Sequence, residues 1–140
     1  MAGSRGKGFS QVTRLALVAE DHSSLREQHS ITLRALGFAV VAVDNGLDAD
    51  RYATDRKLPW DLLLLDNRMP RHGHCRGITG LDILKEIRGM GLAMPAILCS
   101  GDDLAEEAAE LSAHFVSKGS NVIQEITEYV TGLLGDKVMP

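Results

Sequence analysis

The sequence predicts an α/β protein built around a doubly wound, five-stranded parallel sheet. Short apolar runs rich in Val, Leu and Ile alternate five times with segments whose apolar residues recur at helical spacing. The run 62–65 is four consecutive leucines, and a continuously apolar strand is typical of a sheet covered by helices on both faces. Strand–helix–strand units of this kind connect through right-handed crossovers, which give a parallel sheet.

Five apolar runs are expected to form the strands. The first, RLALVA, ends at an acidic pair, and the second is FAVVAV. The third follows Pro59, which breaks the chain ahead of WDLLLLD, and the fourth begins around Pro95. The fifth is short and ends near a lysine. The expected strands are 14–19, 38–43, 60–66, 94–101 and a short strand within 114–120.

Five segments between and after these runs are expected to be helices. Ser23 or Ser24 can cap the first helix, and Gly37 suits its left-handed stop. The turn dipeptide Asn45-Gly46 precedes the second helix. The fourth helix has an acidic first turn, which suits the positive end of a helix dipole. The expected helices are 23–37, 44–56, 80–91, 102–113 and 121–135.

The chain has the length of one compact domain. With 140 residues, we expect a flexible leader over 1–12, a single domain over 13–135 and a C-terminal tail over 136–140. No apolar run approaches the roughly 20 residues of a membrane span, and the leader lacks the apolar core of a signal peptide. We therefore expect a cytoplasmic protein that does not act at a membrane.

Charge and cysteine content exclude two further classes of protein. The net charge of −4 argues against direct nucleic-acid binding, which requires a basic face. Cys75 and Cys99 form neither a disulfide framework nor a CxxC pair, so we expect reduced thiols.

Polar residues stand where the expected strands end. Glu20 and Asp21 follow the first strand, Asp66 ends the third, Ser100 ends the fourth and Lys118 follows the fifth. Because ligands of open parallel sheets bind at the carboxyl ends of the strands, we expect these side chains to converge. Clustered carboxylates repel one another unless a cation lies between them, and hard oxygen ligands suit Mg²⁺. The pattern predicts a magnesium site with a lysine beside it.

The same constellation suits phosphoryl transfer to a carboxylate. An aspartate can act as a nucleophile and carry a phosphoryl group. A cation and a lysine together offset the repulsion between the carboxylate and the incoming group, and catalysis of this transfer is mostly positioning and charge stabilisation. Ser100 could donate a hydrogen bond to the phosphoryl oxygens.

These residues, in this order on a fivefold strand–helix pattern, resemble the receiver domain of two-component response regulators. The resemblance covers about 13–135, and the acidic pair, Asp66 in DNRMP, Ser100 in CSG and Lys118 carry it. It implies a flavodoxin-like (βα)5 fold with strand order 2-1-3-4-5, similar to single-domain chemotaxis regulators without an output domain.

The resemblance also implies a role for each site residue. Asp66 would be the phosphoacceptor, taking a phosphoryl group from a phosphohistidine on a histidine kinase or phosphotransfer protein. Asp21, Asp66 and the backbone carbonyl of Arg68 would bind Mg²⁺, with Glu20 acting mainly through water. Lys118 would pair with Asp66 or its phosphate.

Two further residues would form the switch that reports phosphorylation. Ser100 would move toward the phosphoryl group, and Phe115, three residues before Lys118, would turn inward. This change would remodel the face built by the fourth helix, fifth strand and fifth helix, to which an unidentified downstream protein binds. Phosphate would thus shift the population between two states.

The sequence departs from the family pattern at two places. Gly119 stands where the family usually has a proline with a cis bond, and a non-proline cis bond costs about 2.5–4 kcal/mol, so we expect a trans bond. The loop over 71–79 carries an insertion of about six residues with two arginines, two histidines and a cysteine. A basic rim of this kind could attract an anionic donor or shield the phosphoaspartate from water.

Several alternatives stay open. Gly119 and the insertion favour a pseudo-receiver, a protein-interaction module that is never phosphorylated. A metal-dependent phosphohydrolase would need a second carboxylate where Arg68 stands. His72, His74 and Cys75 lack the paired ligand spacing of a structural zinc site, and a solvated loop is the simpler interpretation.

Overall fold

The computed structural model describes residues 13–69, 77–119 and 121–138. They form a five-stranded sheet in the order β3-β2-β4-β5-β6, and every neighbouring pair of strands is parallel. Counted along the described chain, this is the order 2-1-3-4-5, which confirms the predicted fold class. The leader 1–12 and residues 70–76, which include most of the loop over 71–79, lie outside the described residues.

The strands and helices alternate along the chain as predicted. The strands are β2 (Arg14–Ala19), β3 (Phe38–Val43), β4 (Leu62–Asp66), β5 (Ala96–Ser100) and β6 (His114–Ser117). The helices are α1 (Ser23–Ala35), α2 (Gly46–Ala53), α3 (Gly80–Gly89), α4 (Ala105–Glu110) and α5 (Val122–Val138). None of the described helices is long and apolar enough to cross a membrane.

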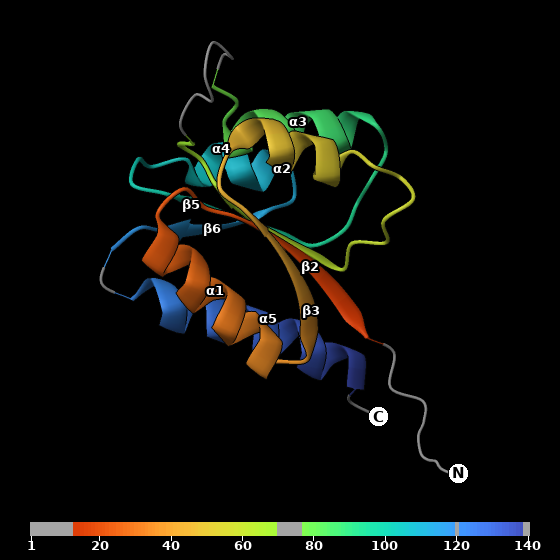
Figure 1. Ribbon diagram of the computed structural model, residues 1–140, viewed down its shortest axis with the longest axis vertical. Helices are drawn as coiled ribbons and strands as arrows, with labels where there is room; N and C mark the ends of the chain where they lie inside the picture. Colours follow the sequence, from red (N-terminus) through yellow and green to blue (C-terminus); the bar gives the residue numbers. More distant parts are fainter. Residues whose placement is uncertain (1–12, 70–76, 120, 139–140) are drawn as a thin grey trace.

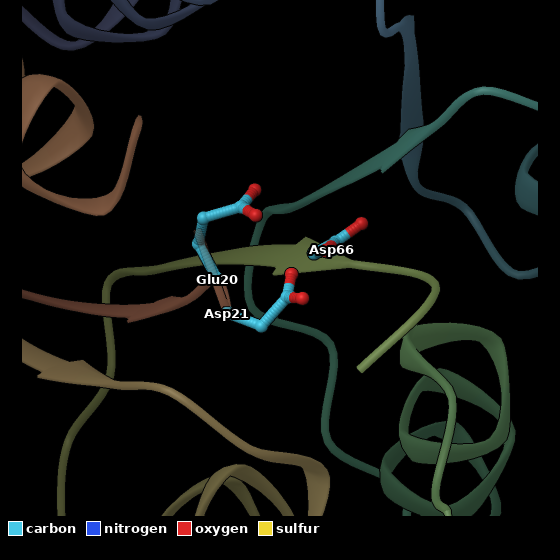
Figure 2. A group of neighbouring side chains, drawn as sticks. All are labelled: Glu20, Asp21 and Asp66. Atoms are coloured by element: carbon cyan, nitrogen blue, oxygen red, sulfur yellow. The ribbon is translucent and has the colours of Figure 1, made fainter. Parts of the chain in front are cut away.

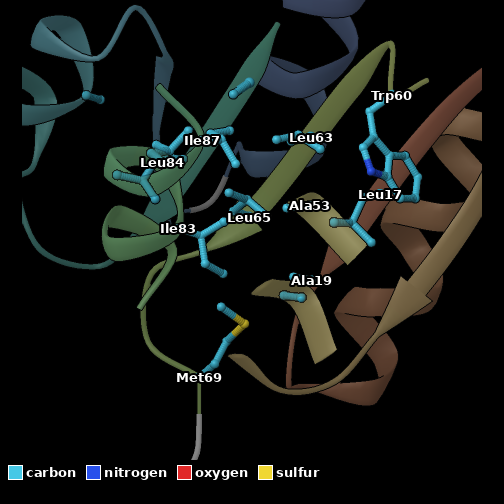
Figure 3. Packing of buried hydrophobic residues seen from close by; sticks show 14 residues of the cluster. Leu17, Ala19, Ala53, Trp60, Leu63, Leu65, Met69, Ile83, Leu84 and Ile87 are labelled. Carbon is cyan, nitrogen blue, oxygen red and sulfur yellow. The ribbon is translucent and has the colours of Figure 1, made fainter. Parts of the chain in front are cut away.

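Helices cover both faces of the sheet. Figure 1 shows α1 and α5 below the sheet and α2, α3 and α4 above it. The four leucines of β4 alternate between these layers. Leu63 and Leu65 pack in the core under α2, α3 and α4 (Figure 3), whereas Leu62 and Leu64 pack in the core against α1 and α5. All four are buried because the strand lies between two hydrophobic cores, which explains the continuous apolar run.

Several helices are shorter than predicted, and a side-chain cap explains the start of α2. The Asn45 side chain accepts a hydrogen bond from the Asp48 backbone N–H, so α2 begins at Gly46 rather than at residue 44. Helix α4 begins at Ala105, whose backbone N–H donates to Asp103, and it ends at Glu110. The predicted helix over 102–113 was therefore too long at both ends.

The last helix differs in the other direction. Helix α5 continues to Val138, past the predicted end at residue 135, so part of the expected C-terminal tail over 136–140 is helical. Gly135 did not end the helix, because glycine disfavours a helix interior without forbidding it.

Candidate functional site

Three carboxylates converge at the C-terminal edge of the sheet. Glu20 and Asp21 follow the end of β2, and Asp66 is the last residue of the neighbouring strand β4. The parallel register pairs Ala19 with Leu65, so Glu20 stands opposite Asp66 and Asp21 follows one residue later. One carboxylate oxygen of each lies within 4.8 Å of the others, and Figure 2 shows the three side chains grouped around one space. The structure thus brings together the acids that the sequence placed at strand ends.

Lys118 supplies the positive charge of this cluster. Its Nζ lies 2.9 Å from Asp66 Oδ1 and 3.3 Å from Glu20 Oε1. The backbone N–H of Lys118 donates to the Ser100 carbonyl at 2.9 Å, which fixes the loop after β6 against the end of β5. The bond to Gly119 is trans, as expected, because the described residues include no cis peptide bond. The lysine therefore reaches the site although glycine, rather than proline, follows it.

Two buried oxygens in the cluster lack a hydrogen-bond partner among the described residues. They are Glu20 Oε1, which faces Lys118 without hydrogen-bond geometry, and Asp66 Oδ2. Glu20 is 1% exposed and Asp66 is 3% exposed. Buried carboxylate oxygens need a compensating donor or cation. An unsatisfied set of hard oxygen atoms around one space fits a divalent cation such as Mg²⁺.

The pKa values of the site follow from the same crowding. Burial, and then the charge of Asp66, raises the pKa of Glu20 to about 7. Burial also raises the pKa of Asp66, although Lys118 opposes the effect. Burial of Asp21 acts in the same direction, but hydrogen bonding with the other two carboxyls outweighs it and lowers the pKa of Asp21. Burial opposes the charge on Lys118, yet its ion pairs with Asp66 and Glu20 raise its pKa, so the ammonium stays charged.

Two cavities open at the cluster. One, of about 570 Å³, is lined by the three acids, Arg68, Lys118 and the start of α1. The other, of about 300 Å³, is lined by Asp66, Arg68, Ser100, Gly101, Asp102 and Lys118. Asp66 is buried at the border of both, so small ligands can reach its carboxylate from the solvent.

Helix α3 is seated directly on the end of β4. Gly80 donates its backbone N–H to the Asn67 carbonyl, and the Asn67 side chain accepts from the Leu81 backbone N–H. A Cβ on Gly80 would lie 2.6 Å from the Asp66 carbonyl oxygen, so only glycine allows this close approach. Thr79 caps the helix with a reciprocal capping box to Asp82. These contacts fix the backbone that carries Asp66.

The start of α1 is also fixed against the site. Arg26 donates from its guanidinium to the carbonyls of Glu20 and Asp21 at 3.0 and 3.4 Å. His22 caps α1, where the sequence predicted Ser23 or Ser24, and its backbone N–H donates to the Glu20 carboxylate. Arg26 was not among the predicted site residues, although a basic residue one helical turn into α1 is a signal for such a contact.

The remaining predicted residues have simpler surroundings. Ser100 is 2% exposed at the end of β5, and its Oγ accepts a hydrogen bond from the Asp102 backbone N–H at 2.9 Å. Phe115 is partly buried on β6, next to Leu98 of β5, and packs on the core beneath α4. His72, His74 and Cys75 lie outside the described residues.

Arg68 makes a contact that the sequence analysis did not anticipate. Its guanidinium donates to Asp102 Oδ2 from Nη2 at 2.6 Å and from Nε at 3.1 Å. Arg68 lies two residues after Asp66, the last residue of β4. Asp102 lies two residues after Ser100, the last residue of β5. Because β4 and β5 are neighbours, equal offsets from their ends bring the two residues near each other, but the offsets do not fix the direction of the side chains.

The family model of the response regulator receiver domain matches residues 16–130, which include every residue of the site. The chain belongs to the response regulator receiver domain family. It is 31% identical over 107 residues to the two-component response regulator ORR41 of Oryza sativa subsp. japonica, over 75% of this chain and 76% of that protein. Receiver domains are signalling switches rather than classical enzymes.

Solved receiver structures share the fold. The CheY-like receiver domain from Methylobacillus flagellatus is 25% identical with a TM-score of 0.69, covering 87% of this chain and 99% of that one. The response regulator TrrA from Thermotoga maritima, solved in complex with Mg²⁺ and BeF, is 26% identical with a TM-score of 0.68, covering 86% of this chain and 99% of that one.

Proposed function

We propose that this receiver domain is a phosphoacceptor switch in a two-component phosphorelay and that Asp66 accepts the phosphoryl group. The observation that carries the proposal is the placement of one buried aspartate between an acidic pair and a lysine. The Asp66 carboxylate has Lys118 Nζ at 2.9 Å on one oxygen, and its other oxygen has no hydrogen-bond partner among the described residues. It opens onto two cavities that can admit a donor.

The acidic cluster fits Mg²⁺. Asp21 and Asp66 would hold the ion by their carboxylates, the Arg68 backbone carbonyl would be a third ligand, and Glu20 would act through water. When bound, the ion would neutralise charge on the incoming phosphoryl oxygens. Without it, three carboxylates share one ammonium ion; burial, with a smaller contribution from a neighbouring carboxylate, raises the pKa of Glu20 and of Asp66.

The transfer step is a substitution at phosphorus. A carboxylate oxygen of Asp66 forms a bond to the phosphorus of a phosphohistidine, and the phosphorus–nitrogen bond of the donor breaks. The electron pair of that bond remains on the imidazole nitrogen of the donor. Lys118 stays protonated throughout and stabilises the negative charge that gathers on the phosphoryl oxygens. The donor is a histidine kinase or a phosphotransfer protein, and we place the reaction in the cytoplasm.

Phosphorylation would be read at the face formed by α4, β6 and α5. Ser100 lines the cavity beside Asp66, and its hydroxyl can donate to a phosphoryl oxygen while it still accepts from Asp102. Movement of the end of β5 would free space for Phe115, which lies beside Leu98 on the neighbouring strand. A downstream protein that prefers the resulting face would shift the population toward it.

The pseudo-receiver alternative has lost one of its two supports. It rested on Gly119 and on the insertion, but Lys118 forms both ion pairs with glycine in the following position. The phosphohydrolase alternative gains no support, because Arg68 directs its guanidinium to Asp102 rather than offering an acid to a leaving group.

Incubation with acetyl phosphate and Mg²⁺ tests the proposal, with intact-mass spectrometry as the readout. Wild-type protein and the control Asp55→Asn, an exposed aspartate after the end of α2, should both gain one phosphoryl group. Asp66→Asn should gain none. Absence of the adduct from wild type, or its persistence in Asp66→Asn, would refute the assignment of Asp66.

A further inference from the structure

The Arg68–Asp102 ion pair lies at the entrance of the site, and its energetics point away from a purely structural role. The side chains of Arg68 and Asp102 are 78% and 53% exposed. Solvent screens such a pair, and exposed ion pairs contribute little to stability. Yet the pair lines the same cavity as Asp66, Ser100 and Lys118. A weak contact held at a cavity wall can be exchanged for a stronger partner at small cost.

An incoming phosphoryl group is such a partner. It carries more negative charge than one carboxylate and offers several acceptor oxygens, and a guanidinium binds oxyanions in a bidentate manner. In the structure both donors of Arg68 converge on a single oxygen, Asp102 Oδ2, so this pair does not use the two-oxygen geometry that guanidinium favours. The cavity already presents Lys118 to the same space.

We propose that Arg68 is a phosphoryl-binding residue of this site and that Asp102 is its competitor, which holds the guanidinium until a phosphoryl group replaces the carboxylate. The inference rests on the proposed function of Asp66. It adds a second cation to the site and a carboxylate that opposes binding.

The exchange would also reach the switch residue. The Asp102 backbone N–H donates to Ser100 Oγ at 2.9 Å, so the residue that holds Arg68 also holds the hydroxyl. Release of the Asp102 side chain frees the loop after β5 to follow Ser100 toward the phosphoryl group. Capture of the anion by Arg68 and movement of Ser100 are thereby coupled through one residue.

A structural strut and a competing pair make opposite predictions. If the pair only stiffens two loops, Arg68→Ala and Asp102→Asn remove the same interaction and change anion binding in the same direction. If Asp102 competes for Arg68, Arg68→Ala should weaken binding of the phosphoryl mimic beryllofluoride by about tenfold, and Asp102→Asn should tighten it by about threefold. Isothermal titration calorimetry with saturating Mg²⁺ measures both.

Two controls separate competition from a general change in charge. Asp103→Asn removes the same charge from the neighbouring exposed residue and should leave affinity nearly unchanged. In the double variant Arg68→Ala, Asp102→Asn the gain from Asp102→Asn should disappear, because there is no guanidinium to release. Equal gains from both asparagine variants, or a gain that survives in the double variant, would overturn the proposal. Failure of wild type to bind beryllofluoride would instead count against the function proposed for Asp66.

Discussion

His29 gives the folded protein a sensitivity to mild acid that can be calculated from its surroundings. It lies on the buried side of α1, is 1% exposed, and neither ring nitrogen has a hydrogen-bond partner among the described residues. Burial, with a smaller contribution from the charge of Lys118, lowers the pKa of His29 from 6.5 to about 4. A buried imidazole without a partner strongly resists protonation.

The sign and size of the effect follow from linkage. Because the folded pKa is depressed, the unfolded chain takes up the proton first as the pH falls. The stability that comes from neutral His29 is present above pH 6.5 and is lost as the pH falls toward 4. Each pKa unit corresponds to about 1.4 kcal/mol, so the full loss is about 3 kcal/mol and the loss between pH 7 and pH 5 is about 2 kcal/mol.

The assay is urea unfolding of wild type and His29→Leu at pH 7 and pH 5 in metal-free buffer. Wild type alone does not isolate the effect, because the raised pKa values of Glu20 and Asp50, about 7 and about 6, add stability as the pH falls. Those contributions cancel when the two proteins are compared. The variant should lose about 2 kcal/mol less than wild type between pH 7 and pH 5. His29→Gln also cannot titrate and is a second variant for the case that leucine packs poorly at this position. Its stability should fall between pH 7 and pH 5 by the same amount as that of His29→Leu. An identical loss in wild type and both variants would refute the reasoning.

Three further predictions concern the site and the core. Gly80→Ala should lower the free energy of unfolding by about 2 kcal/mol, because the added Cβ would lie 2.6 Å from the Asp66 carbonyl oxygen. Gly89→Ala on the same helix adds a Cβ with no atom within 4 Å and should raise the free energy of unfolding by up to about 1 kcal/mol. Equal effects of the two variants in urea unfolding would contradict this. Lys118→Met should destabilise the metal-free protein by about 2 kcal/mol, because the buried carboxylates of Glu20 and Asp66 lose their cation. In thermal melts, Mg²⁺ should stabilise this variant more than it stabilises wild type. Burial raises the pKa of the Cys99 thiol to about 12. In a Cys75→Ser background, this thiol should therefore not react with a maleimide at pH 7 until urea unfolds the chain. Rapid labelling of the folded protein would show that the cysteine is accessible.

The convergence of the site could be predicted because it depends on topology. Parallel strands place the residues after their C-terminal ends at one edge, so Glu20, Asp21, Asp66 and Lys118 had to approach one another once the strand pattern was recognised. The position of Lys118 was less certain, since Gly119 removed a rigid turn. The hydrogen bond from the Lys118 backbone N–H to the Ser100 carbonyl fixes the position of the lysine, and no sequence pattern predicts this bond.

Features set by side-chain direction could not be predicted in the same way. Whether Arg68 points to Asp102 or to solvent depends on torsion angles that solvent-exposed residues leave nearly free. Histidine is polar and is commonly found at the surface, yet His29 lies on the side of α1 that faces the core and is buried. The start of α2 at Gly46 depends on the Asn45 side-chain cap rather than on apolar periodicity.

The ion pair between Lys118 and Glu20 joins positions 98 apart in the chain. Lys118 therefore meets the acidic pair only in a chain that includes β6 and the residue after it, and a fragment that ends before β6 would hold Glu20, Asp21 and Asp66 without that ammonium group. The charge balance of the acidic cluster is for this reason set jointly by the end of β2 and by the residue that follows β6.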